Sequence, residues 1–370
     1  MNSTVVHMKT MTRKERLRRC YFNEELDRPA VYSRTGFPQD DPTYDALKAY
    51  LNCYTELKAE WYGCQFESAY PVDVRTKPYS EDFVRRIEVL HTSLGDLERS
   101  SFVSLKGQPG LHETCYLKCP DDAEKYLSLP LPQLEGAPSS FFVADATIGE
   151  KGIVDVCLGM NPAGFVVELC GSEAFAMMSI TDRDTLHRLL ERQMTIILRR
   201  VKFLLRAGVG PYFSMLGEEY IVPPLHGPAD FADFNVRYDK PIIDLIHNAG
   251  GRIHIHSHGS IKGVFQGFID MGVDVLHPFE PPPMGNILAH EAKSLARDKM
   301  CLEGNIQINR MYEATQEEIR EETEQLIRDA FDDGKGLIVC PTASPYIRNK
   351  GNVCLPQYKA MIDTVINWSR

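Results

Sequence analysis

Three histidines stand at alternate positions of one short stretch: His254, His256 and His258 in the segment GGRIHIHSHG. Alternation is the period of a β-strand, so the three imidazoles would leave the strand on one face. Two neighbouring imidazoles at a strand end can bind the same metal ion, whereas a polar strand end with one satisfied core histidine needs no ligand. We expect His256 and His258 to bind a metal. His254 lies one layer deeper, and we expect it to be a hydrogen-bonded core residue.

Further donor side chains stand where other apolar, strand-like runs end: Glu280 in VLHPFE, Cys340 in LIVCPT, Glu303 and Asn305 in LEGN, and Glu218 and Glu219 in SMLGEE. Two imidazoles, a carboxylate and a thiolate make a tetrahedral zinc set, although cobalt or iron would also accept these donors. The pattern therefore predicts a zinc site formed by His256, His258, Glu280 and Cys340. Taken singly, Cys340 would equally suit a small buried residue, and Glu280 a loop anchor.

Strands and helices alternate after residue 140. The apolar, β-rich runs predict strands at 139–149, 164–172, 211–216, 252–258, 273–280, 300–306 and 336–342. Amphipathic patterns predict helices at 184–208, 239–251, 261–272, 286–298, 315–331 and 355–369. This alternation is typical of a parallel sheet covered by helices. No Gly-x-Gly-x-x-Gly follows a strand, so we expect an α/β fold of the (β/α)8 TIM barrel type, with its site at the carboxyl ends of the strands.

The N-terminal part has a different pattern. Residues 13–22 read as a helix, residues 80–107 alternate like antiparallel hairpins, and residues 119–130 contain a Pro-Asp-Asp helix start. No Ser/Gly-rich linker separates this part from the remainder. We therefore expect one domain over 1–370, in which 37–135 is an antiparallel, β-rich elaboration of the barrel.

Composition excludes several classes of function. The net charge of −10 provides no basic surface for nucleic acid. No run reaches the roughly 18 apolar residues of a membrane span, and the N-terminus lacks a hydrophobic signal core. Ten cysteines without a regular framework fit a reducing compartment. We expect a cytoplasmic enzyme that binds a small molecule.

From about residue 150 to the end, the chain resembles the uroporphyrinogen decarboxylase superfamily, in particular its methyltransferase branch. The resemblance rests on GGRIHIHSHG, MGVDVLHPFEPPPMGNI, CLEGNIQ and GLIVCPTASP, together with DRPAVYSRTG near the start. It implies a (β/α)8 barrel. The tetrapyrrole decarboxylases of this superfamily hold substrate carboxylates with an Arg-Gln-Ala-Gly-Arg segment. Here Ser33-Arg34-Thr35-Gly36 matches a single arginine, which speaks against decarboxylation of uroporphyrinogen.

The methyltransferase branch carries a zinc motif, His-x-Cys followed far downstream by Cys, with a Glu between them in related enzymes. On this chain the motif falls on His256, His258, Glu280 and Cys340. His258 replaces a thiolate, which would make the ion harder and less electron-rich. The resemblance thus implies a metal-dependent methyltransferase that moves a methyl group between a corrinoid and a small-molecule donor or thiol acceptor.

The same resemblance implies partners and further site residues. Because the chain lacks an Asp-x-His-x-x-Gly cobalamin motif, the corrinoid would be carried by a separate protein docked at the barrel mouth. Family members often dimerise, which makes a homodimer the default. Glu219 is the candidate for proton handling or substrate contact, and Arg34 and Asn305 are the candidate substrate anchors. All three could equally fix loops.

Three other functions stay open from sequence. One is a tetrapyrrole or small-acid decarboxylase that works without metal. The second is metal-dependent hydrolysis, for which barrels with histidines at strand ends are also suited. The third is a non-enzymatic barrel that binds and delivers a corrinoid or tetrapyrrole.

Overall fold

Eight short strands form one parallel sheet in this computed structural model, which describes residues 11–63, 70–106, 110–134 and 136–368. The order across the sheet is β1-β12-β11-β10-β9-β8-β7-β2. The strands are β1 (Ala30–Val31), β2 (Leu57–Trp61), β7 (Gly152–Met160), β8 (Tyr212–Leu216), β9 (Arg252–His256), β10 (Val275–His277), β11 (Cys301–Ile306) and β12 (Leu337–Pro341). Apart from β2, most of their residues are buried, as expected of strands covered on both faces.

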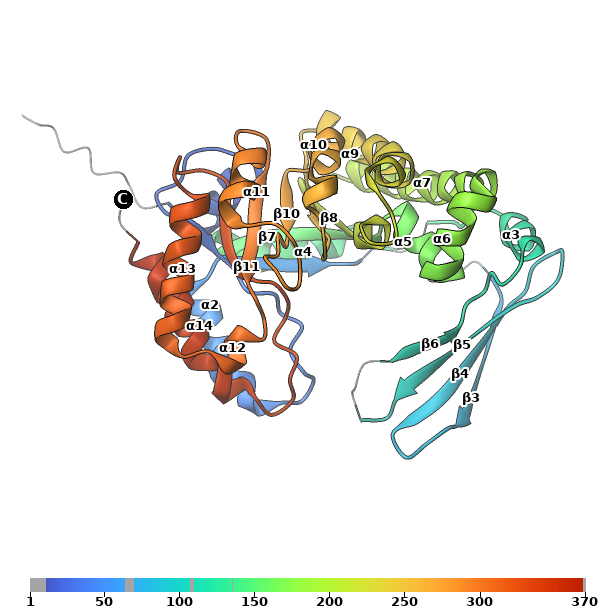
Figure 1. The fold of residues 1–370 in the computed structure, drawn as a ribbon, viewed down its shortest axis with the longest axis horizontal. Coiled ribbons are helices and arrows are strands. Elements are labelled where there is room, and N and C mark those ends of the chain that lie inside the picture. Colours follow the sequence, from blue (N-terminus) through green and yellow to red (C-terminus); the bar gives the residue numbers. More distant parts are fainter. Residues whose placement is uncertain (1–10, 64–69, 107–109, 135, 369–370) are drawn as a thin grey trace, which may run out of the picture.

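The sheet is curled, in an arrangement compatible with a TIM-like fold (Figure 1). Its two edge strands are linked through Glu56, the residue that precedes β2. The backbone N–H of Glu56 donates to the carbonyl of Val31 in β1 over 3.0 Å, and its Oε2 accepts from the N–H of Val31 over 2.7 Å. Arg16 and Arg28 neutralise this buried carboxylate over 2.6 and 3.0 Å. The two edges of the parallel sheet are therefore held together by a charged side chain as well as by a backbone bond.

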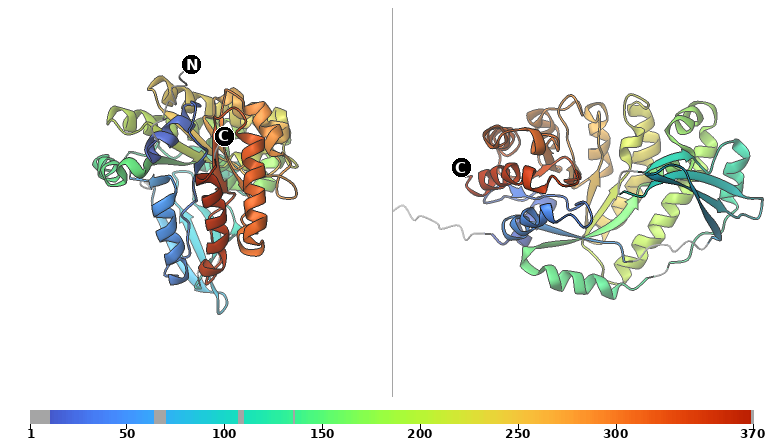
Figure 2. Two further views of the ribbon diagram at one scale, coloured as in Figure 1. Left: turned by 90° about the vertical axis from the view of Figure 1, so that its left-hand side faces the viewer. Right: turned by 90° about the horizontal axis from the view of Figure 1, so that it is seen from below.

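Helices surround the sheet (Figure 2). The longer ones are α1 (Arg13–Tyr21), α2 (Asp45–Tyr54), α4 (Ser139–Ile148), α5 (Pro162–Cys170), α6 (Ser172–Thr181), α7 (Arg183–Arg206), α9 (Arg237–Asn248), α10 (Phe265–Met271), α11 (Ala289–Ala296), α13 (Gln316–Ala330) and α14 (Gly351–Ile366). Short turns complete the set: η1 (Pro42–Tyr44), η2 (Gly149–Lys151), η3 (Glu218–Ile221), α8 (Pro228–Asp230), the π-helical η4 (Phe231–Val236), η5 (Lys262–Val264) and α12 (Arg310–Glu313).

A second sheet projects as an arm from the part of the molecule that contains the curled parallel sheet (Figures 1 and 2). It is antiparallel, in the order β3-β4-β5-β6, and consists of β3 (Val72–Pro78), β4 (Phe83–Leu90), β5 (Leu97–Ser104) and β6 (Leu111–Thr114). Its base packs on α3 (Pro120–Leu127) and on α5 through Leu90, Leu97 and Tyr116. The arm lies at the end of the barrel where α12 follows β11, which is the carboxyl end of the parallel strands.

The structure confirms the expected mixture of a parallel sheet and an antiparallel N-terminal part, but corrects two elements. Residues 139–149 and 164–172, expected as strands, belong to the helices α4 and α5, and the strand β7 lies between them. A short apolar run does not distinguish a buried strand from a buried helix by periodicity. The decisive local signals are Asn161, which caps α5 by accepting from the N–H of Gly164 over 2.7 Å, and Pro162 in its first turn.

The parallel sheet and its helices also take residues from the region expected as an elaboration, since α2 and β2 both lie within 37–135. Among the described residues, no single helix is long and apolar enough to cross a membrane. The helices α5 and α6 pass that test jointly, but they are bent by 106° relative to each other.

Candidate metal site at the carboxyl end of the parallel sheet

A buried group of possible metal ligands lies on the strands of the curled parallel sheet. It consists of His254 in β9, His277 in β10 and Glu303 in β11, and one ligand atom from each lies within 4.8 Å of the others. No second group of three or more such side chains is found among the described residues. Two imidazoles and a carboxylate are a ligand set typical of zinc.

His254 corrects the expectation that it would be a hydrogen-bonded core residue. Both of its ring nitrogens are buried and have no hydrogen-bond partner among the described residues. Its Nε2 lies 3.6 Å from Oε1 of Glu303, too far for a good hydrogen bond, and that oxygen is also without a partner. Unpaired buried polar atoms are costly and rare, and a bound ion would satisfy them. The residues present therefore fit a metal.

His256 and His277 face each other at the entrance to this group. Their Nδ1 atoms are 2.8 Å apart, and the two rings are stacked. Nε2 of His277 lies 3.2 Å from the carbonyl oxygen of Pro341, which can only accept, so the proton of a neutral His277 belongs on Nε2. Arg34 donates to Nδ1 of His256 over 3.2 Å. Two Nδ1 lone pairs then point at each other, which is a favourable arrangement only when a proton or a cation lies between or beside them.

Electrostatics keep these imidazoles neutral. Burial lowers the pKa of His256 far below its usual range, and the neighbouring His277 imidazole and Arg34 guanidinium act in the same direction. Burial likewise lowers the pKa of His277, against the opposing effect of Glu303. A neutral imidazole is the form that binds metal, and a ligating histidine typically donates its other N–H to a carbonyl, as His277 does here.

Lys58 provides the compensating charge. Its ammonium contacts Oε2 of Glu303 and lies over the ring of Tyr32, 4.8 Å from the centroid. Burial tends to raise the pKa of Glu303, but the charge of Lys58 and then that of His254 lower it well below its usual range. Glu303 is therefore ionised, with one oxygen on Lys58 and the other free toward His254. On the opposite wall burial raises the pKa of Asp155, whose Oδ1 also has no partner.

These groups line a small cleft of about 50 Å³. Its walls include Tyr32, Arg34, Lys58, Asp155, Cys157, Ser214, His254, His256 and Glu303. A space of this size holds an ion with one or two waters. A bulky reactant would have to approach from the open end.

Of the four sequence-predicted ligands, His256 lines this cleft, and His258 and Glu280 form a pair with each other. His256 lies beside Arg34 and His277, as described above. His258 approaches Glu280, with 3.1 Å between Nδ1 and Oε2, and its ring centroid is 4.7 Å from that of His256. Cys340 is fully buried in β12, and burial raises the pKa of its thiol. These four side chains do not form one group with all ligand atoms within 4.8 Å.

The other predicted residues lie nearby. Glu219 is in η3, directly after β8, where its Oε2 accepts from the N–H of Gly217 over 3.1 Å. Burial raises its pKa, and the charges of His258 and Arg34 act against that rise. Asn305 donates from Nδ2 to the carbonyl of Phe279 over 3.0 Å, so its amide fixes the backbone between β10 and Glu280.

Sequence reasoning did not single out Lys58, Asp155, His277 or the ligand role of Glu303. Residues 57–61, Leu-Lys-Ala-Glu-Trp, lack an apolar run, although Leu57, Ala59 and Trp61 alternate with polar residues. That alternation was the available signal that the side chain of Lys58 lies on the opposite face of the strand from those of Leu57, Ala59 and Trp61.

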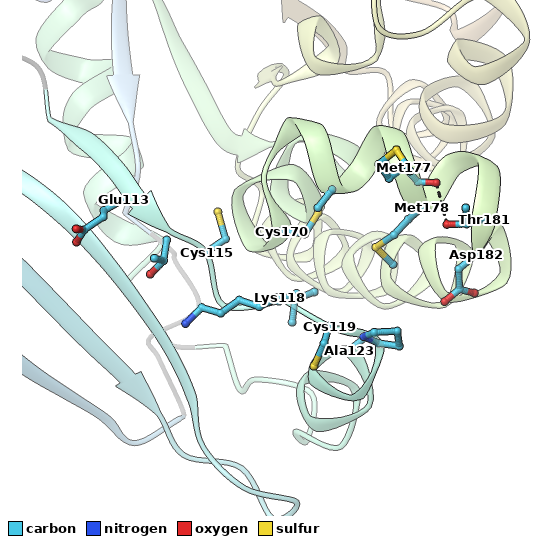
Figure 3. A pocket seen from close by; sticks show the side chains of 14 residues that line it. Glu113, Cys115, Lys118, Cys119, Ala123, Cys170, Met177, Met178, Thr181 and Asp182 are labelled. Carbon is cyan, nitrogen blue, oxygen red and sulfur yellow. Dashed lines mark hydrogen bonds between the residues drawn. The ribbon is translucent and has the colours of Figure 1, made fainter.

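A larger cavity, of about 480 Å³, lies away from this site between β6, α3, α5 and α6 (Figure 3). Its walls carry sulfur atoms from Cys115, Cys119, Cys170, Met177 and Met178. Within the described ranges these thiols form no group that could hold a metal. The smaller cleft is therefore the candidate functional site because of its possible metal ligands and not because of the size of its cavity.

Comparisons with known proteins concern the family and the fold of this chain. Residues 161–346 match the model of a family described as uroporphyrinogen decarboxylase (URO-D). None of the curated proteins matches the chain. A solved methyltransferase from Methanosarcina mazei is similar over 96% of this chain and 98% of its own, with a TM-score of 0.60 and 15% sequence identity.

A putative vitamin-B12 independent methionine synthase from Listeria monocytogenes is similar over 66% of this chain and 74% of its own, with a TM-score of 0.41 and 12% identity. At such identities the likeness to solved structures concerns the fold alone. The likeness to the first structure extends over nearly the whole chain.

Proposed function

We propose, from the premise that this chain belongs to the uroporphyrinogen decarboxylase family, that it is a metal-dependent methyltransferase. The observation that carries the proposal is the buried group of His254, His277 and Glu303, in which both nitrogens of one imidazole and one carboxylate oxygen have no partner. The fold that the chain shares with a methyltransferase supports it. We further take the curled parallel sheet as a (β/α)8 barrel with its site at the carboxyl ends of the strands.

In this proposal the inner group of His254, His277 and Glu303 holds the ion, with His256 at its entrance. The sequence-predicted set of His256, His258, Glu280 and Cys340 is the alternative ligand set. When bound, a zinc ion would lower the pKa of a substrate thiol so that the thiolate exists at neutral pH. The methyl carbon would then pass from the cobalt of a corrinoid, which keeps the electron pair of the broken bond, to the sulfur.

The chain's own residues would hold the reactants and move the proton. Glu219 lies at the open end near His258 and Arg34, and its raised pKa suits a group that accepts the thiol proton. Arg34 holds Nδ1 of His256 and faces the cleft, where it would also contact a negatively charged part of the small molecule. A separate corrinoid protein would dock at the end of the barrel beside the arm.

Metal analysis of the purified protein tests this proposal first. His254→Ala, His277→Ala and Glu303→Gln should each lose the metal, whereas His290→Ala, on the exposed side of α11, should retain it. If His258→Ala and Cys340→Ser lose the metal and the inner variants retain it, the alternative set is the ligand set. A wild-type protein that binds no transition metal would refute the metal-dependent mechanism.

Activity is measured in the same variants by following methylcobalamin spectroscopically in the presence of small thiols. Demethylation of the cobalamin with formation of the thioether is the expected result. Activity that persists in a chelated, metal-free enzyme would also refute the mechanism.

Decarboxylation is the second candidate function, because Arg34 and Lys58 line the cleft and cationic side chains bind carboxylates. Release of carbon dioxide from a carboxylated substrate in the presence of a chelator would favour it over methyl transfer.

A further inference from the structure

A second polar cluster lies behind the turn that follows β8. Asn161, Glu218, Asn235 and Asp239 all have side chains with no solvent exposure. They come from four elements: the N-cap of α5, the first residue of η3, the π-helical η4 and the first turn of α9. Four fully buried polar residues from separate parts of the chain are unusual outside functional or ligand-binding positions. A π-helical turn at the same place is a further feature often found at such positions.

Hydrogen bonds tie three of these residues together. Asn161 donates from Nδ2 to Oδ1 of Asn235 over 3.0 Å and to Oδ2 of Asp239 over 2.9 Å. Asn235 in turn donates from Nδ2 to the backbone carbonyl of Glu218 over 3.2 Å. Asn161 thus uses both of its amide hydrogens within the cluster. The carboxylate of Glu218 receives no hydrogen bond from the described residues.

Both carboxyl groups are incompletely satisfied. Neither Oε1 nor Oε2 of Glu218 has a hydrogen-bond partner among the described residues, and the same holds for Oδ1 of Asp239. Burial raises the pKa of Glu218 well above its usual range, and the carboxylates of Asp239 and Glu219 act in the same direction. Burial raises the pKa of Asp239 to about 8, against the hydrogen bond from Asn161. No lysine, arginine or histidine is among the described groups that act on either carboxyl group.

Protonation does not remove the need for a hydrogen-bond partner. A protonated carboxyl group gains an O–H donor, which needs an acceptor of its own when it is buried. None of the three unpaired oxygens receives a hydrogen bond from a described residue. A positive charge between the two carboxylates would satisfy both the charge and the lone pairs.

We propose that a hard divalent cation, Ca²⁺ or Mg²⁺, binds between Glu218 and Asp239, behind the turn that carries Glu219. The available donors are carboxylate oxygens, with amide and backbone oxygens beside them, which is the ligand type that these cations prefer over transition metals. The cation stabilises the fold and holds the Gly217–Glu219 turn in place. This site is independent of the metal group at the barrel mouth and does not rest on the proposed activity.

Thermal unfolding of the full chain tests the proposal. Protein freed of metal with a chelator is compared with the same protein in millimolar Ca²⁺ or Mg²⁺. At a cation concentration about a hundred times the dissociation constant, the melting temperature should rise by about 3 to 4 °C. The rise should be absent in Glu218→Gln and in Asp239→Asn. It should persist in Asp233→Asn, a matched control in the same π-helical turn, because that carboxylate already pairs with Arg183 over 2.6 Å.

Equilibrium dialysis of wild-type protein against Ca²⁺ or Mg²⁺, followed by elemental analysis, gives a second measurement that does not depend on the folding of any variant. One tightly held ion per chain, retained in a His254→Ala and His277→Ala double variant, is the expected result. That retention separates this site from the metal group at the mouth. A wild-type protein whose melting temperature does not respond to either cation, or a response that survives both Glu218→Gln and Asp239→Asn, overturns the proposal.

Discussion

Lys58→Met should destabilise the metal-free protein by about 3 to 5 kcal/mol, because it removes one partner of a buried ion pair. Only 7% of Lys58 is exposed and Glu303 is not exposed at all, so water cannot replace the lost contact. The ammonium also lies over the rings of Tyr32 and Tyr21, at 4.8 and 5.5 Å from their centroids. Methionine keeps much of the volume of the lysine stem, so the loss reports on charge and not on a cavity.

The effect should depend on pH in a defined direction. In the wild type the pKa of Glu303 lies below its unfolded value, so its contribution to stability is present above that value and is lost as the pH falls through the folded pKa. Without Lys58, burial dominates and the pKa of Glu303 should rise above the unfolded value. Protonation then relieves the buried charge. The difference in free energy of unfolding between wild type and Lys58→Met should therefore be largest near pH 8 and shrink toward pH 5.

Urea unfolding of both proteins in the presence of a chelator, at several pH values, measures these differences. The double variant Lys58→Met with Glu303→Leu should recover most of the lost stability, since neither buried charge remains. Lys58→Met should also bind a transition metal more tightly than the wild type, because the ammonium no longer competes for the carboxylate. A loss below 1 kcal/mol at pH 8, or a loss that does not change with pH, would refute the assignment of Lys58 as the charge partner of Glu303.

Three further outcomes follow from the site and the fold. Glu219→Gln should lower the methyl-transfer rate by about 100-fold or more, as expected for a proton-accepting group, with unchanged metal content; an unaltered rate would remove its role. Cys340 should resist alkylation by iodoacetamide in the native, metal-free protein while the exposed Cys53 and Cys119 react, because burial raises the pKa of the Cys340 thiol and excludes the reagent; mass spectrometry locates the label. Thr315→Ala should cost about 1 kcal/mol in urea unfolding and leave activity intact, because it removes the capping box with which Thr315 and Glu318 begin α13.

The elements that sequence predicted well are those with a strong local signal. The helix from Gln316 was expected from its capping box, and β12 from a continuous apolar run. The helices α4 and α5 were mistaken for strands because both are short and mostly apolar. In such a run the spacing of apolar residues does not distinguish a helix from a strand. In α5 nearly every residue is buried, so the polar face that normally reveals a helix is missing.

The candidate site shows a different limit of prediction from sequence. The alternation in β9 correctly predicted that His254 and His256 face the same way, since both line the cleft. Which donors meet them depends on the register between neighbouring strands, and no single strand contains that information. His277 lies opposite His256 in the parallel ladder, so β10 presents an imidazole to His256, whereas Glu280 lies beyond the end of the strand, beside His258.

Glu303 reaches the same depth from β11 and meets Lys58 from the strand at the far edge of the sheet. The curl that brings Lys58 across to Glu303 is a property of the whole eight-stranded sheet. The local sequence could therefore indicate candidate donors at the strand ends. That His254, His277 and Glu303 come together could be known only from the three-dimensional fold.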